Sequence, residues 1–176
     1  ILMKYFVKFI VVTFFFLQCT YALAEQKIVY LDMTFVLNKS KAGEGAQIFL
    51  KKTFEENQKK FIIQENELKN EESNLLGKKN VLTKEEYKKN SEDLRKKVLD
   101  YRKERRTFLD NIAKQRSEAR QILIQKIDPI LKTYSQENNV TLVIDKKFIL
   151  SGKTDLDITE IIVEKLNKEF PSLNLQ

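Results

Sequence analysis

The chain has 176 residues and a formal net charge of +7, from 32 lysines and arginines against 25 aspartates and glutamates. It contains no histidine and a single cysteine. Zinc sites and base-activated nucleophiles are built mainly from these two residue types, so the composition argues against a zinc enzyme and a histidine-dependent hydrolase. We therefore expect a protein that is not an enzyme, with no catalytic residues, no metal site and no cofactor.

Residues 1–24 have the organisation of an export signal. Two lysines precede an apolar run over 9–17, and an A-x-A cleavage site ends at Ala24. The run is shorter than the about 20 residues that span a bilayer, which disfavours an uncleaved anchor. A lipoprotein signal at Cys19 is disfavoured because the preceding glutamine is not small. We predict an exported protein that is cleaved after Ala24.

Short segments near both ends of the remaining chain have the apolar runs of buried strands. KIVYLDM at 27–33 places apolar side chains on both faces, as in a buried strand, and VTLVID at 140–145 predicts a second strand. FIL at 148–150 is a candidate third strand, closed by a turn at Ser151 and Gly152. These segments predict a small β-sheet.

Residues 157–169 predict a closing helix. Asp157 or Thr159 is the expected cap, and Pro171 follows the helix end. Its expected apolar face consists of Ile158, Ile161, Ile162 and Leu166.

Between these ends lie two long helical patterns with a narrow apolar stripe. The apolar positions are symmetric about Val81, which predicts the stacked pairs Leu75–Tyr87, Leu68–Leu94, Phe61–Tyr101, Phe54–Phe108 and Leu50–Ile112. We predict an antiparallel coiled-coil hairpin over 49–119, with its tip near 77–83 and a length of about 45–50 Å. Two separate helices of a globular bundle are the alternative, but bundle helices need a wider apolar stripe.

Local signals place the ends of these helices. TKEE at 83–86 predicts a capping box that starts the second helix, and Gly77 is a suitable C-cap for the first. Pro129 lies inside the return pattern and predicts a kink or a new helix capped by Asp128, of which we favour the kink. Two polar seam layers, Asn57–Arg105 and Glu71–Ser91, should make the hairpin easy to bend.

The two ends, 25–48 and 120–176, predict one head domain. A core of that size is only marginally stable alone and usually needs a disulfide, a bound metal or self-association. Neither a disulfide nor a metal site is expected there, so self-association through the strands is the expected staple. The predicted fold is α+β, with a small β-strand head that self-associates and a long helical hairpin arm.

The positive charge is concentrated on the tip and return helix of the arm. Residues 50–77 hold five basic and six acidic side chains, whereas 78–106 hold twelve basic and six acidic. Such an excess attracts an anionic partner, either an acidic polypeptide or an anionic lipid surface, although solubility is a simpler alternative. The residues predicted to bind such a partner through their charge are Lys78, Lys79, Lys84, Lys88, Lys89, Arg95, Lys96, Lys97, Arg102, Lys103, Arg105 and Arg106.

Apolar side chains also occur beside the predicted seam and in the tip turn. Each of them could simply widen the seam. Together with the basic residues they could instead form a surface suited to an unfolded, apolar, acidic chain. The predicted apolar client-binding residues are Ile62, Ile63, Leu76, Val81, Leu82, Leu99 and Leu109.

The two ends resemble the Skp (OmpH-like) family of periplasmic chaperones. IVYLDMTFVLNKSKAGEGAQ at 28–47 is similar to its N-terminal segment, and LVIDKKFILSGKTDLDITEIIVEKLNK at 142–168 to its C-terminal segment. The residues that match the family pattern are Asp32, Val36, Leu37, Ser40, Gly43, Asp157, Ile158, Thr159, Leu166 and Asn167.

The resemblance implies a periplasmic homotrimer whose helical arms surround a cavity. Members of the family hold unfolded outer-membrane β-barrel proteins there without ATP, which prevents their aggregation. A structural coiled-coil spacer of the cell envelope is an alternative function. A nucleic-acid-binding protein is a weaker alternative, because the arm lacks stacking platforms and a groove-reading motif, and export would remove the partner.

Overall fold

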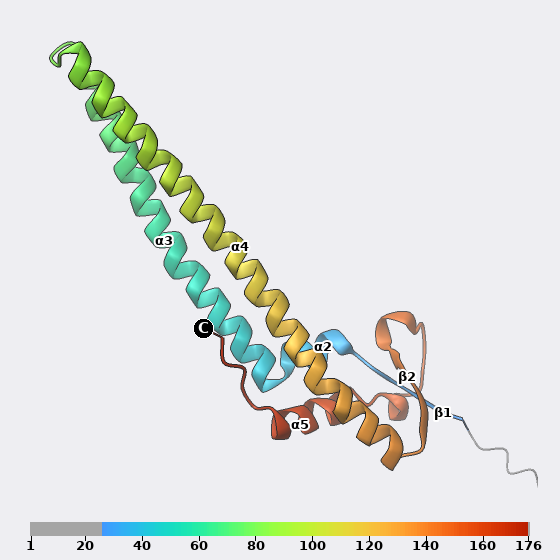
Figure 1. Ribbon diagram of the computed structural model, residues 1–176. Helices are drawn as coiled ribbons and strands as arrows, with labels where there is room; N and C mark the ends of the chain where they lie inside the picture. The colour runs from blue at the N-terminus through green and yellow to red at the C-terminus, as the bar shows by residue number, and fades with distance from the viewer. Residues whose placement is uncertain (1–25, 176) are drawn as a thin grey trace, which may run out of the picture.

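The computed structural model describes residues 26–175 and shows a small head from which a long helical hairpin extends (Figure 1). The elements in chain order are β1 (Lys27–Leu31), α2 (Met33–Lys39), α3 (Lys41–Gly77), α4 (Lys84–Glu137), β2 (Val140–Asp145), two 3₁₀ turns (Lys146–Phe148 and Thr154–Leu156) and α5 (Thr159–Glu169). The predicted signal peptide lies outside the described residues. Over 26–175, no helix combines the length and apolar character needed to cross a membrane.

The sheet of the head consists of β1 and β2, which pair in parallel with Val29 opposite Val143. The long α3–α4 hairpin forms most of the connection between them. Both predicted strands are confirmed; β1 is buried from Val29 to Leu31, whereas no residue of β2 is fully buried. The α+β class and the antiparallel hairpin are confirmed as well.

The expected third strand at 148–150 is wrong. The side chain of Asp145 accepts a hydrogen bond from the backbone N–H of Lys147 at 3.1 Å, which turns the chain into a 3₁₀ turn directly after β2. Ile149 N–H then donates to the carbonyl of Lys146 at 3.0 Å. This local hydrogen bonding takes the place of the ladder that a third strand would need.

Two caps divide the segment after β1 into two helices, so helical structure begins well before residue 49. Asp32 Oδ1 accepts from Phe35 N–H at 2.8 Å and starts α2, while Ser40 Oγ accepts from Gly43 N–H at 3.2 Å and starts α3. A Cβ at Gly43 would lie 1.8 Å from the carbonyl oxygen of Leu37. Glycine is therefore required where α2 and α3 meet.

The core of the head lies between the sheet, α2, α5 and the last turns of α4. Its largest fully buried apolar side chains are Val29, Val36, Ile127, Ile158, Ile162 and Leu166.

Helix α4 continues through Pro129, so a new helix at this point is excluded, while the favoured kink stays a prediction. Ile127, Ile130 and Tyr134 recur on one face at helical spacing, and their burial holds the helix against the core across the proline.

Helix α5 begins at Thr159, and its apolar face differs by one position from the expected one. Ile161 is 42% exposed, whereas Val163 is buried. The core lies on the side of the helix that carries Thr159 and Val163, which turns Ile161 towards solvent. The expected cap Asp157 accepts a hydrogen bond from the backbone N–H of Thr159 at 3.0 Å, whereas Ile158, directly before the helix, makes no side-chain capping bond.

Candidate functional site

Aromatic side chains join the two helices of the arm in its lower half. The ring centroids of Phe54 and Phe108 are 6.3 Å apart, and those of Phe61 and Tyr101 are 6.0 Å apart. Phe61 also contacts Phe108, with centroids 5.6 Å apart. Two of the predicted seam pairs are thereby confirmed, and the rings form a continuous ladder between α3 and α4.

The seam of the arm is thin. On the tip side of Leu50 and Ile112, no described side chain of α3 or α4 is buried, and the predicted seam residues are only partly covered. A helix pair held this way gains little apolar burial per residue. The arm is therefore the part of the chain that opens or bends at the lowest cost in free energy.

The polar layers of the seam form differently from expectation. Glu71 reaches Lys97 at 2.7 Å and not Ser91, whose hydroxyl donates to the Tyr87 carbonyl of its own helix at 2.8 Å. The amide of Asn57 likewise donates within its own helix, to the Thr53 carbonyl at 2.9 Å. The short side chains of Asn57 and Ser91 form hydrogen bonds to carbonyls of the preceding turn in their own helices. The carboxylate of Glu71 therefore pairs with the ammonium group of Lys97.

A second cross-helix contact lies beside the aromatic ladder. Tyr101 Oη donates to Glu65 at 3.3 Å, and Glu65 also accepts from Lys69 at 2.8 Å. The hydrogen bond from Lys69, with smaller help from Tyr101, holds the pKa of Glu65 below its usual value. In turn, the hydrogen bond to Glu65 and its negative charge raise the pKa of Lys69. These groups are exposed, so they fix side-chain orientation more than they stabilise the arm.

The tip turn, residues 78–83, is closed by the predicted capping box. Thr83 Oγ1 accepts from Glu86 N–H at 3.3 Å, and the Glu86 carboxylate accepts from Thr83 N–H at 3.0 Å. The backbone N–H of Thr83, and after it the Thr83 hydroxyl, donate to the Glu86 carboxylate and lower its pKa. Gly77 is the last residue of α3 and not its C-cap; Lys78 caps the helix with its N–H on the last carbonyls. No glycine among the described residues has a positive φ, so the expected glycine cap does not form.

All twelve predicted basic residues are exposed, and we call them the basic patch. Among the described residues, only Lys97 and Arg106 of this patch lie within 4.0 Å of an acidic side chain. The other ten charges have no ion-pair partner in this part of the chain. Their role in binding stays a prediction, but most of the positive field of the patch is not neutralised locally.

The predicted apolar residues lie on the outside of the arm. Six are exposed, from 44% for Leu109 to 84% for Val81, and Leu82 is half-buried. This exposure argues against widening of the seam for Ile63, Leu76, Val81 and Leu99. Ile62 and Leu109 also line a small crevice of about 90 Å³ beside the aromatic ladder. Contact with a client stays a prediction for all seven.

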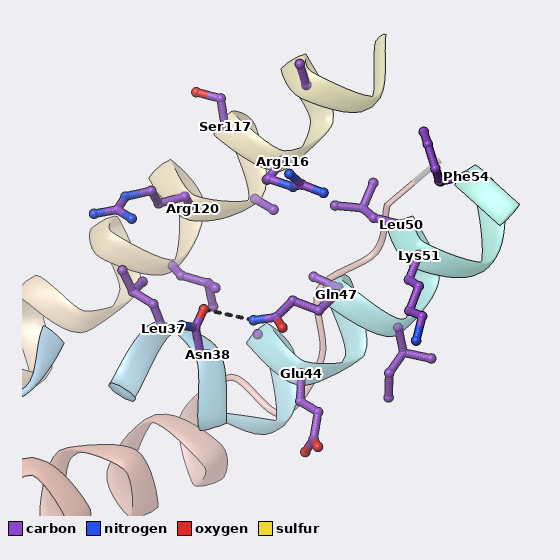
Figure 2. Close-up of a pocket in the computed structure, with 16 residues that line it drawn as sticks. Leu37, Asn38, Glu44, Gln47, Leu50, Lys51, Phe54, Arg116, Ser117 and Arg120 are labelled. Carbon is purple, nitrogen blue, oxygen red and sulfur yellow. Dashed lines mark hydrogen bonds between the residues drawn. The ribbon is translucent and has the colours of Figure 1, made fainter. Parts of the chain in front are cut away.

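A larger groove of about 870 Å³ lies at the base of the arm, between the first turns of α3 and the facing turns of α4 (Figure 2). We call it the base groove. Leu37, Ala46, Leu50 and Ala119 are buried beneath it, and Phe54 closes its distal end. The seam there consists partly of alanine, so the two helices leave space that larger side chains fill further along the arm.

Comparisons with known proteins agree with this architecture. Residues 27–166 match the family model described as outer membrane protein (OmpH-like). The chain belongs to the OmpH-like family. The matched segment contains the whole sheet, the whole hairpin and most of α5, so the family is defined by head and arm together.

Two known proteins are similar to this chain over most of their length. A Skp-like protein of Pseudomonas aeruginosa is 25% identical over 173 residues, which cover 94% of this chain and 99% of the relative. The crystal structure of an OmpH-like protein from Caulobacter crescentus superimposes with a TM-score of 0.79 at 15% identity, over 89% of this chain and 93% of that one. At that identity the second match establishes the shared OmpH-like fold alone.

A polar cluster in the head holds the segments on which the sequence resemblance to the family rests. Thr159 Oγ1 accepts from Asp32 N–H at 2.8 Å and donates to Asp157, which ties the end of β1 to the start of α5. Asp157 also accepts from Lys146 at 2.9 Å. Burial raises the pKa of Asp157, but the bonds from Thr159 and Lys146 outweigh burial and leave it below its usual value. This cluster is internally satisfied and has a structural role.

The base groove is the part of the candidate site that the sequence analysis missed. Arg116 and Arg120 were not among the predicted site residues, because they lie outside the basic excess at 78–106. Their spacing with Ala113 and Ser117 is that of one helix face, which is the signal that could have indicated a common wall. Over residues 26–175 no group of three or more histidine, cysteine, aspartate or glutamate side chains could hold a metal ion.

Proposed function

We propose that this OmpH-like protein is an ATP-independent periplasmic holdase. It binds unfolded outer-membrane β-barrel proteins in a cavity between the basic arms of a homotrimer and prevents their aggregation. Family membership supports this function, since the Pseudomonas aeruginosa relative is called Skp-like and the Caulobacter crescentus protein is described as a candidate outer membrane chaperone.

The observation that carries the proposal is the surface of the arm. Ten basic side chains without an acidic partner lie on the same half-exposed hairpin as six exposed apolar side chains. The charges attract an acidic unfolded chain over about 8–10 Å at physiological salt. The apolar groups then gain burial against the client. Both interactions tolerate many sequences, as a holdase requires.

Exposed apolar side chains of the head support self-association. Ile28, Leu142, Phe148 and Leu150 are 42%, 51%, 75% and 106% exposed. Strand β2 pairs only with β1 in the described sheet, so its other edge is open. Exposed apolar side chains and an open strand edge are costly in water, and further copies of the chain would cover both. Three arms held at one end would then enclose the client space.

The proposal is tested by diluting a urea-denatured outer-membrane β-barrel protein into buffer with the chain from residue 25 and no ATP. Light scattering is followed across a salt series. We expect suppressed aggregation that weakens as salt rises. A chain that lacks residues 55–107, joined by a short linker, should lose the effect; full protection by this truncated chain would overturn the proposal.

A matched pair of variants separates the basic patch from total charge. The test variant changes five lysines of the patch to glutamine: Lys78, Lys79, Lys84, Lys88 and Lys89. The control changes five lysines of α3 to glutamine: Lys51, Lys52, Lys59, Lys60 and Lys69. We expect the test variant to protect several-fold less well than the control. Equal loss in both would show that net charge, and not the patch, governs capture.

An anionic lipid surface is a second candidate partner for the arm. Val81 is 84% exposed at the tip, between lysines that have no acidic partner among the described residues. An apolar side chain flanked by cations is suited to the boundary of an anionic bilayer. Flotation with anionic and neutral vesicles tests this contact, and Val81→Ser should weaken binding to the anionic vesicles only.

A further inference from the structure

The base groove has one wall on α4, which carries two arginines, and one wall on α3. Four residues of α4, Ala113, Arg116, Ser117 and Arg120, follow each other at helical spacing and form one wall. The facing wall on α3 follows the same spacing with Glu44, Gln47, Ile48 and Lys51. The groove therefore runs along the arm axis, with buried apolar side chains at its floor and polar side chains on both rims.

Within residues 26–175, the two arginines of the groove have no hydrogen-bond or ion-pair partner. Neither Arg116 nor Arg120 makes a salt bridge or hydrogen bond to any of residues 26–175. Figure 2 shows Arg116 pointing from α4 towards Leu50, whereas Arg120 extends in the opposite direction, towards the head end of the groove. Glu44 is the one acidic side chain that lines the groove, and Figure 2 shows it turned away from both arginines.

Gln47 and Lys51 of the α3 wall already have partners. Gln47 donates its amide to Asn38 at 2.8 Å, and Lys51 lies 3.9 Å from Glu55. A ligand therefore meets two free guanidinium groups above an apolar floor. Guanidinium groups bind carboxylates through two parallel hydrogen bonds, which makes arginine the preferred partner of a carboxylate.

We infer that the base groove docks an extended segment of an unfolded polypeptide in which an apolar side chain neighbours one or two carboxylates. The apolar side chain lies over Leu50 and Phe54, and the carboxylates lie against Arg116 and Arg120. The inference rests on the proposed function, since the ligand is part of the client. It adds a defined docking point at the base of the arm to the diffuse attraction of the tip.

The groove also differs from the tip in rigidity. Ala46, Leu50, Ile112 and Ala119 are buried, whereas no described side chain on the tip side of Leu50 and Ile112 is. A preformed site loses less conformational entropy on binding than a flexible surface does. A client segment docked here is held close to the head while the remainder of the client stays mobile between the arms.

The test titrates the full chain from residue 25 into a fluorescein-labelled 12-residue peptide of alternating leucine and aspartate, and follows anisotropy. The comparison probe is the same peptide with asparagine in place of aspartate. We expect the aspartate peptide to bind about tenfold more tightly, a difference that follows from two exposed charge-assisted contacts. Equal affinity for the two peptides would overturn the inference.

Three variants locate the binding. Arg116→Gln with Arg120→Gln should weaken the aspartate peptide about tenfold, while the matched control Lys59→Gln with Lys60→Gln should change it less than twofold. Ala113→Phe fills the groove without changing charge and should weaken both peptides. Unchanged affinity in both groove variants would overturn the inference. A change of oligomeric state in these variants, measured by light scattering after gel filtration, would overturn it too, because the groove would then be an interface between copies.

The outcome is separable from that of the holdase test. If the chain suppresses β-barrel aggregation but the groove variants bind the peptide normally, the docking site fails and the holdase function stands. If peptide binding depends on the groove and aggregation is not suppressed, the holdase function fails and the groove remains a peptide site of another kind.

Discussion

The head and the arm are stabilised in opposite ways. In the head, thirteen buried residues form one cluster that joins the sheet, α2, α4 and α5. Between Leu50 and Ile112 the arm buries no described side chain and relies on an aromatic ladder and a few cross-helix polar contacts. The head is thus a fixed platform, while the arm keeps the exposed and adaptable surface that binding of unfolded chains requires.

The largest difference between the two regions should appear in the head core. Ile162 is 0% exposed, so Ile162→Ala should lower the free energy of unfolding by about 2–5 kcal/mol. Its neighbour Ile161 is 42% exposed, and Ile161→Ala should cost well under half of that. Urea unfolding of both variants checks this, and equal losses would contradict the placement of α5.

The corner between α2 and α3 gives the next effect. Gly43→Ala places a Cβ against the Leu37 carbonyl oxygen, which should lower the free energy of unfolding by about 1–3 kcal/mol. Gly45→Ala is the control, since a Cβ there meets nothing within 4 Å. The control should stabilise α3 by about 0.5–1 kcal/mol, because alanine has the higher helix propensity. Thermal unfolding distinguishes the two, and the same sign for both would be unexpected.

A smaller effect, confined to the arm, should follow from breaking the aromatic ladder. Phe61 is half-buried, so Phe61→Ala should cost about 1–2 kcal/mol, less than for a fully buried ring. Hydrogen exchange should accelerate in the amides of α3 and α4 on the tip side of the ladder. Protection in β1 and α5 should stay as it was. Faster exchange throughout the head would mean that arm and head unfold together.

The smallest effect should be local to the tip. Thr83→Ala removes the cap of α4 and should cost about 1 kcal/mol, seen as faster exchange in its first turn. Because hydrogen bonds from Thr83 lower the pKa of Glu86, the cap stabilises the tip above the unfolded pKa of glutamate. That contribution is lost as the pH falls through the lowered pKa. Exchange at the tip of the Thr83→Ala variant should therefore depend less on pH than in the unchanged chain.

Patterns along the sequence predicted the hairpin well because its contacts are regular. The symmetric spacing about Val81 indicated which residues stack, and the pairs Phe54–Phe108 and Phe61–Tyr101 follow from that spacing alone. The capping box at Thr83 depends on four neighbouring residues and is equally local. The polar layers were predicted less well, since long side chains reach partners far from the opposite position: Lys97, which pairs with Glu71, lies six residues after the expected partner Ser91.

The sequence by itself determined the α+β class, the two strands, the antiparallel arm and the position of its positive charge, because helical periodicity, apolar runs and charge counts are local quantities. Only the tertiary structure decided that residues 148–150 leave the sheet, that Val163 and not Ile161 enters the core, and that α4 continues through Pro129. It also decided where the base groove lies, between segments some 70 residues apart in sequence. Such features depend on which surfaces the fold brings together, and no local pattern contains that information.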